Sequence, residues 1–369
     1  MSIYGRELFV LFYTCGAWRY LIGGKVTNSS AHFLFIIMKR FILSLFALVC
    51  VTMSFAQSSL LATLSHDGNI KTFYGAKALI EAHNAAENGD VITLSSGSFV
   101  ATDIEKALTI RGAGMEADSV NGTLPTIITG SFNIQIPDTV SERITLEGIY
   151  NNQTIRYNCT LNKPMFLKCR FAELRSANGN KIIDASFIHC RITEKIYLDN
   201  DCSASCVNSI IADPERYSMN TSNFEFTNCF IYGPNIHNIC SSSFRNSIII
   251  TGRNEENYDL DRSVTAFNCV GDAPKLFNNI PNTTNKIAVA SGLFKTYKGG
   301  NFNDSDSFEL TDEAKTKFLG TDGTQVGIYG GMLPYDPTPS NPHITKCNVA
   351  AKSTADGKLS VDIEVKAAE

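Results

Sequence analysis

The chain has little charge and no surplus of basic residues. Lys and Arg number 32 against 36 Asp and Glu, so the formal net charge is -4, and only 18% of the residues are charged. Nucleic-acid binding needs a basic face that neutralises phosphates. We therefore expect no nucleic-acid partner.

A long hydrophobic run is also missing. The longest apolar stretch, from Phe41 to Phe55, is shorter than the roughly 20 residues that a membrane-spanning helix needs. A membrane anchor is therefore the weaker interpretation of this stretch. We expect no transmembrane segment in the mature chain.

The same stretch has the layout of a signal peptide. Lys39 and Arg40 precede it, and small residues follow at Ser54 and Ala56, which predicts cleavage between Ala56 and Gln57. A signal peptide over 38–56 leaves residues 1–37 without a role, so we interpret them as a mis-annotated upstream segment. Export to the periplasm, the outer surface or the medium is the expectation.

Cysteine is neither abundant nor even in number after that cleavage point. Eleven cysteines minus Cys15 and Cys50 leave nine. This odd number, at low density, argues against a disulfide framework as the basis of the fold. Disulfides between individual pairs remain open at this stage.

What the sequence does contain is a repeat. Six segments align on a Cys or a Ser: FLKCRF, FIHCRI, CVNSII, FTNCFI, FRNSII and AFNCVG. The aligned positions are Cys169, Cys190, Ser209, Cys229, Ser247 and Cys269. Successive steps of 21, 19, 20, 18 and 22 residues indicate a solenoid with about 20 residues per coil.

Each unit contains a bend. The Cys or Ser and the apolar residue two later alternate as in a strand, but the Phe three positions earlier breaks that period of two. Four units place Asn before the Cys or Ser: Asn208, Asn228, Asn246 and Asn268. Because Asn tolerates the left-handed conformation, each unit predicts strand, tight corner, strand. Stacked units predict an all-β fold, a right-handed parallel β-helix with ladders of like residues inside.

Both ends of the solenoid have predicted caps. A helical stripe of Ala78, Leu79, Ala82 and Ala86 predicts a capping helix, and residues 57–76 read as a hairpin turning at Asp67-Gly68. The β-helix is expected over 77–331. Residues 332–369 are expected to form a linker and a C-terminal hairpin packed on the last coil, or the stub of a further β-domain.

Two segments resemble known proteins. The run from Lys77 to Gly114, with NGDVITLSSGSF and IEKALTIRGAG, resembles the opening of pectin-lyase-like β-helix proteins. GTDGTQVGIYGG, Gly320 to Gly331, is similar to the closing segment of secreted β-helix proteins of the Bacteroides type. The resemblance implies the fold and export, but the family spans lyases, hydrolases and adhesins, so it implies no single activity.

Candidate chemical residues are few. YDLDR predicts a shared strand face for Asp259 and Asp261 beside Arg262, the best catalytic set if the protein is an enzyme. Asp199 and Asp201 form a second pair, and each pair is a candidate for Ca²⁺, the one cofactor considered. Solvated turn carboxylates are the simpler interpretation of both pairs.

Two tripeptides resemble the O-glycosylation acceptor of Bacteroides-type proteins. They place candidate modification sites at Ser119 and Thr139. A glycan at either position would imply an exposed loop.

Three functions remain open from the sequence. The first is a non-catalytic protein that binds glycan or host polymer along its flank, with sugar stacking on tyrosines at 150, 157, 197, 232 and 258. The second is a divergent polysaccharide lyase or glycoside hydrolase, and the third is a structural spacer. The low charged fraction favours the first and third. The sequence leaves the oligomeric state open.

Overall fold

The computed structural model describes residues 60–117, 124–177, 179–198, 201–212, 214–216, 223–233, 236, 239–252, 258–281, 284–338, 343–349, 352–353 and 357–366. The chain divides into two compact units, Met1–Ser58 and Ser59–Glu369. Everything described here belongs to the second. The predicted upstream segment, the signal peptide and the cleavage point between Ala56 and Gln57 lie outside the described residues.

The described unit is built from two large sheets. The first has eleven strands in the order β2 (Asn69–Tyr74), β1 (Leu61–His66), β3 (Val91–Leu94), β5 (Thr109–Arg111), β8 (Thr145–Glu147), β11 (Met165–Leu167), β14 (Ala185–Ile188), β16 (Ser203–Val207), β19 (Asn223–Thr227), β21 (Ser243–Arg245) and β23 (Thr265–Phe267). The second has twelve, and its main path is β25 (Lys286–Ile287), β24 (Val270–Gly271), β22 (Ile248–Ile250), β20 (Phe230–Tyr232), β17 (Ile210–Ala212), β15 (Arg191–Leu198), β12 (Arg170–Ser176), β9 (Ile149–Tyr157), β6 (Thr126–Thr129) and β4 (Gly97–Val100). Off this path, β7 (Phe132–Ile134) pairs with β9 and β18 (Pro214–Arg216) with β15. A small separate pair joins β10 (Leu161–Asn162) and β13 (Ile182–Ile183).

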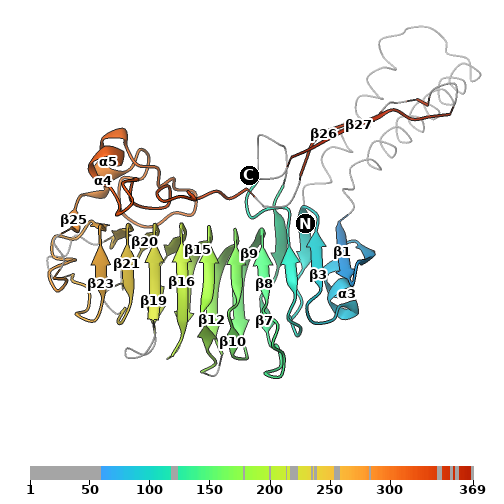
Figure 1. The fold of residues 1–369 in the computed structure, drawn as a ribbon, viewed down its shortest axis with the longest axis horizontal. Helices are drawn as coiled ribbons and strands as arrows, with labels where there is room; N and C mark the ends of the chain where they lie inside the picture. Colours follow the sequence, from blue (N-terminus) through green and yellow to red (C-terminus); the bar gives the residue numbers. More distant parts are fainter. Residues whose placement is uncertain are drawn as a thin grey trace, which may run out of the picture. The chain divides into compact units, whose positions relative to one another are not determined.

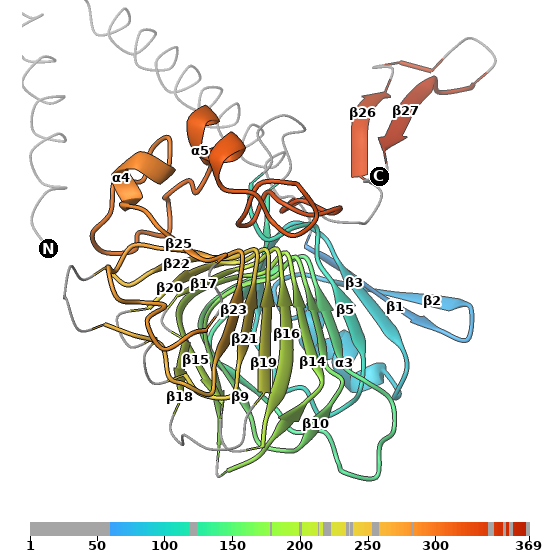
Figure 2. The same cartoon turned by 60° about the vertical axis from the view of Figure 1, so that its left-hand side comes forward.

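From β3 onward the chain passes back and forth between the two sheets, and stacked strands of successive coils are parallel (Figure 1). The result is an all-β parallel solenoid of about 8 turns with roughly 20 residues per turn, and about 7% of the chain is helical. In Figure 2 the two sheets face each other around a common interior. The fold class and the coil length predicted from the repeat are confirmed.

The corners between the two sheets have the backbone that the Asn pattern predicts. Asn208, Asn228, Asn246 and Asn268 have φ values of 44°, 52°, 52° and 52°. Lys168 and His189 hold the same corner position in their coils, with φ of 50° and 52°. The left-handed residue turns the chain between two strands, and this accounts for the odd spacing from Phe to Cys.

Inside the solenoid, equivalent residues of successive coils stack in register. Phe166 pairs with Phe187, and their rings are parallel with centroids 4.8 Å apart. Phe226 and Phe244 repeat this arrangement at 4.9 Å. The aligned Cys and Ser residues are all buried: Cys169, Cys190, Ser209, Cys229, Ser247 and Cys269. The predicted internal ladders are therefore present.

The N-terminal end is closed by a helix and a hairpin. Helix α3 (Ala78–Ala85) buries Ala78, Leu79 and Ala82, while Gly89, with φ of 91°, lets the chain turn into β3. Strands β1 and β2 pair antiparallel around Asp67-Gly68, where φ is positive at both residues. This is the two-residue turn that favours Asp-Gly.

The C-terminal part of the solenoid unit contains two short helices and a long return segment. Helices α4 (Ala290–Leu293) and α5 (Asp312–Lys317) lie within residues 290–318, here named the cover segment. Residues 319–338, here named the strap, follow the cover segment along the corner edge of the coils (Figure 1).

The strap is held by the corner side chains. Asn268 Nδ2 donates to the Leu319 carbonyl, Asn208 Nδ2 to the carbonyls of Ile328 and Gly330, and Lys168 Nζ to that of Thr338. As the strap advances, its partners therefore step back from coil to coil. The corner residues thus turn the chain and also dock its C-terminal segment.

The last element is a hairpin of β26 (His343–Val349) and β27 (Val361–Lys366), paired antiparallel. Leu359, Val361 and Ile363 of its expected apolar face are 51%, 49% and 53% exposed. The packing of this face on the last coil stays a prediction.

Candidate functional site

The site forms on the outer face of the second sheet. The residue after each inward Cys or Ser begins a strand of this sheet and points outward, because side chains alternate along a strand. Pairing in register gives one outward row along the coils: Tyr150, Arg170, Arg191, Ile210, Phe230, Ile248 and Val270. The row changes from polar to apolar between Arg191 and Ile210.

The cover segment packs on the apolar part of this row. Phe308 lies against Phe230 with ring centroids 3.6 Å apart, and Phe294 meets the same ring edge-on. Leu293, Leu310 and other cover residues complete this second core outside the solenoid. The cover thus buries the apolar strand starts and leaves the polar ones at its border.

At that border lies a cleft of about 720 Å³. Its lining includes Tyr150, Arg170 and Arg191 from the coils, Glu116 from the loop after β5, and residues 303–308 of the cover. Tyr329 and Tyr335 of the strap complete it. The cleft therefore joins side chains from the coil strands, the loop after β5, the cover and the strap.

Two arginines dominate the electrostatics of the cleft. The Arg170 guanidinium lies 4.5 Å from the centre of the Tyr150 ring. Arg191 Nε donates to Asp304 Oδ1 at 2.8 Å, and its Nη1 lies 3.9 Å from Glu116 Oε1. Arg170 Nη2 contacts the second oxygen, Asp304 Oδ2. The two cations are thus bridged by one carboxylate.

The two tyrosines of the strap are neutral donors and acceptors. Burial raises the pKa of Tyr329 and, more strongly, that of Tyr335. The Tyr335 hydroxyl is buried and has no hydrogen-bond partner within the described part of the chain. Neither phenol ionises near neutral pH, so they suit hydrogen bonding better than proton abstraction.

No protein-family model, no curated protein and no solved structure matches this chain. Among the described residues, none of the helices has the length and apolarity needed to cross a membrane. The class that the fold itself defines is a parallel β-solenoid protein.

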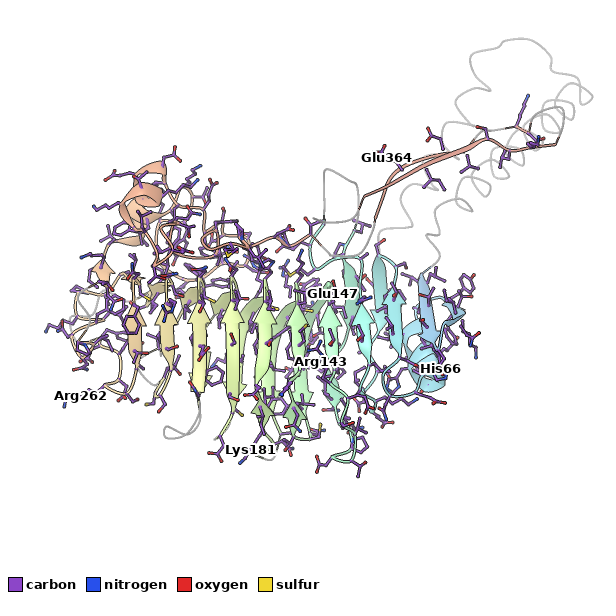
Figure 3. All side chains as sticks on the ribbon, viewed as in Figure 1. His66, Arg143, Glu147, Lys181, Arg262 and Glu364 are labelled. Carbon is purple, nitrogen blue, oxygen red and sulfur yellow. The ribbon has the colours of Figure 1, made fainter. Side chains whose placement is uncertain are left out.

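The shared strand face expected for Asp259 and Asp261 is absent, and a catalytic role for these residues stays a prediction. Residues 258–261 are irregular and lead into a turn instead of forming a strand with a shared face. Asp259 Oδ2 accepts from Asn279 Nδ2, and Asp261 accepts from the amide and hydroxyl of Ser263, which lowers the pKa of Asp261. Arg262 is exposed at the β23 end of the stack (Figure 3). These carboxylates stabilise the turn ahead of β23.

Of the second carboxylate pair, Asp199 and Asp201, only Asp201 is among the described residues. Asp199 lies outside the described residues. Asp201 is exposed, with φ of 59°, and its carboxylate accepts from Lys181 Nζ at 2.7 Å. In the described part of the chain, no three His, Cys, Asp or Glu side chains gather as a metal site would require.

The predicted row of tyrosines is wrong as an exposed surface. Tyr157 is 0% and Tyr258 is 5% exposed, because both point into the solenoid. Tyr232 packs under Phe302 of the cover, and the side chain of Tyr197 lies outside the described residues. Tyr150 remains available, at the cleft.

Only one of the two candidate glycosylation sites is among the described residues. Thr139 is exposed in a turn after β7, whereas Ser119 lies outside the described residues. Exposure meets the steric requirement for modification of Thr139, which stays a prediction.

The sequence carried a signal for part of the cleft. Arg170 and Arg191 follow the aligned cysteines in FLKCRF and FIHCRI, so strand alternation alone places both outside in adjacent coils. Glu116 and Asp304 belong to no repeat unit. Only the tertiary structure brings them to the arginines.

Proposed function

We propose that the protein is a non-catalytic glycan-binding β-solenoid protein whose binding site is the cleft at Tyr150, Arg170 and Arg191. The observation that carries this proposal is the pairing of an aromatic ring with planar cationic donors on the floor of a cleft of about 720 Å³. Aromatic rings pack on the apolar faces of sugars, and guanidinium groups donate to several oxygens at once. The proposed binding surface is therefore this cleft and not the whole flank that the sequence suggested.

The chemistry of the cleft supports binding over catalysis. Its carboxylates Asp304 and Glu116 face Arg191, and burial raises the pKa of the two tyrosines. The two phenols stay protonated near neutral pH, so they suit hydrogen bonding to a ligand better than proton abstraction.

One observation favours a second candidate. Arg191 contacts two carboxylates, Asp304 and Glu116, from different segments. Glycoside hydrolysis uses such a carboxylate pair. A divergent hydrolase or lyase acting in this cleft is therefore the alternative.

The test is retention of the purified protein on a panel of immobilised neutral and acidic polysaccharides. We expect retention on at least one, with at least about fivefold weaker binding for Tyr150→Ala, since a stacking ring contributes roughly 1 kcal/mol or more. Tyr74→Ala is the matched control, because Tyr74 is 65% exposed on edge strand β2.

New reducing ends or an unsaturated product in the same incubation would show cleavage, and the hydrolase or lyase alternative would then replace the non-catalytic proposal. Equal retention of wild type and Tyr150→Ala would remove the cleft from the proposal. If the protein neither binds nor cleaves any member of the panel, the structural-spacer function is the one that remains.

A further inference from the structure

The Asp304 carboxylate occupies a position that suits a ligand. Oδ1 accepts from Arg191 Nε at 2.8 Å and Oδ2 contacts Arg170 Nη2. Arg191 also donates to the backbone carbonyls of Asp304 and Asp306. Two guanidinium groups that each contact one oxygen of the same carboxylate provide the charge-assisted hydrogen bonds by which proteins recognise carboxylates.

The two largely buried arginines require a neighbouring negative charge. Arg170 pairs with Arg191 in register on β12 and β15, so their backbones are about 4.8 Å apart. The Arg191 side chain is only 8% exposed and that of Arg170 is 22% exposed. A buried cation without a counter-charge is strongly destabilising, and two neighbouring ones repel each other. An anion must therefore sit here.

Asp304 reaches the arginines from a short loop with its own internal order. Asn303 Oδ1 accepts from the Ser305 amide, and Asp306 Oδ2 accepts from the Asn303 amide. Phe302 and Phe308 flank the loop and pack on each other with centroids 6.0 Å apart. The loop is thus anchored at both ends by rings, and its local bonds are made while Asp304 pairs with the arginines.

One donor of the pair is still unused. Arg170 Nε is buried and has no hydrogen-bond partner among the residues that the structure describes. Asp304, tethered by its backbone, leaves this donor unsatisfied. An untethered carboxylate has the freedom to use it.

We infer that Arg170 and Arg191 form a carboxylate subsite, that Asp304 fills it in the absence of ligand, and that the carboxylate of an acidic sugar displaces Asp304. This inference rests on the proposed function and names its ligand class: a polymer that contains uronic acid units. Asp304 then sets specificity, because a neutral sugar has no group that can replace it.

The closing experiment compares Asp304→Asn with wild type, using a galacturonate oligosaccharide, a sulfated oligosaccharide and a neutral galactose oligosaccharide as probes in calorimetry. Asn keeps the size of the side chain and removes the competing charge. We expect at least tenfold tighter binding of the galacturonate probe and an unchanged neutral probe. Asp312→Asn is the charge-matched control, because Asp312 is 89% exposed on α5.

A second readout uses wild-type protein, so it holds whether or not the variant folds well. Hydrogen exchange of the amides of 303–307 should accelerate when the galacturonate probe binds, because the loop is released. Unchanged or slower exchange upon binding would overturn the displacement.

The two proposals fail in different ways. If Asp304→Asn binds no acidic probe, or binds it no better than Asp312→Asn does, the subsite is refuted even where neutral glycans bind through Tyr150. If Asp304→Asn binds the galacturonate probe and Tyr150→Ala has no effect, the subsite stands and the stacking site falls. Preference for the sulfated probe would refute a carboxylate-specific site.

Discussion

The aligned cysteines and serines share a hydrogen-bonding role at the corners. Cys229 Sγ donates to the Cys206 carbonyl at 3.2 Å, and Ser209 Oγ donates to that of Phe187 at 3.2 Å. Cys190 and Ser247 make the same bond to the carbonyls of Phe166 and Phe226. The position therefore needs a small side chain with one hydrogen-bond donor. Both Cys and Ser meet this requirement, and this explains why either residue occurs there.

This role predicts different costs for two replacements of Cys229. Cys229→Ser keeps the donor and should change the free energy of unfolding by no more than about 1 kcal/mol. Cys229→Ala removes the donor and leaves a buried carbonyl less satisfied, so we expect a loss of about 1–3 kcal/mol. Urea unfolding followed by circular dichroism measures both. Equal stability of the Ser and Ala variants would contradict the hydrogen-bond role and leave packing alone.

At the scale of elements, the strap fastens the coils along their corners. The strap contacts three corner Asn residues. The Asn208 side-chain amide donates to two strap carbonyls at 2.8 Å, and the backbone amide of Thr321 donates to Asn246 Oδ1. Gly331 of the strap passes close to Asn228. A Cβ built on Gly331 would lie 2.1 Å from Asn228 Nδ2, so this glycine is required for close approach. The strap thus depends on side chains that the repeat supplies once per coil.

Asn208→Ala tests this fastening. The change removes two buried donors, so we expect a loss of about 2–3 kcal/mol and faster hydrogen exchange in strap residues 326–331. Asn268→Ala is the matched control at the same corner position, where a single bond of 3.1 Å is made by a more exposed side chain. Equal exchange in the two variants would mean that the cover, and not the corner amides, holds the strap.

At the scale of the whole molecule, the interior contains a column of buried thiols. Cys169, Cys190, Cys206, Cys229 and Cys269 are buried and form no disulfide in the structure. Burial raises the pKa of Cys169, Cys229 and Cys269 from 9.0 to about 12, and burial also raises the pKa of Cys190 and Cys206. The folded state therefore holds thiol protons that the unfolded chain releases at lower pH.

This difference predicts alkaline destabilisation. The thiol contribution to stability is fully present below pH 9 and is lost as the pH rises from 9 towards about 12, because there the unfolded state binds fewer protons. Each buried thiol contributes a slope of up to about 1.4 kcal/mol per pH unit. Urea midpoints from pH 8 to 11 measure it, and Cys229→Ser should reduce the slope by one thiol's share. An unchanged slope in that variant would contradict the assignment.

The sequence predicted most of the solenoid because its information is local and repeated. A period near 20, an odd Phe-to-Cys spacing and an Asn at the bend are sufficient for the coil length, the corner conformation and the inward ladders. The capping helix followed from its apolar stripe in the same way. Each of these features depends on residues that are neighbours in the chain or in the adjacent coil.

The expected geometry of Asp259 and Asp261 is wrong because it depends on a regular strand, which is absent at 258–261. Asp259 and Asp261 alternate in sequence, but Ser263 and Asn279 draw them into a turn. The spacing of the tyrosines does not determine which face of a coil each occupies, and Tyr157 and Tyr258 face inward. A residue's face is set by its distance from the corner, which varies where the loops vary.

By itself, the sequence determined the repeated architecture of this protein and the outward placement of Arg170 and Arg191, since strand alternation and a left-handed corner are local constraints that recur in every coil. Only the tertiary structure decided that the cover segment buries the apolar end of the same row, that the strap returns along the corners, and that Asp304 reaches both arginines. The physical reason is that these contacts join segments far apart in the chain, 113 residues for Arg191 and Asp304, 120 for Asn208 and Ile328 and 51 for Asn268 and Leu319. Contacts at such separations follow from how the whole chain packs and from no pattern within one repeat.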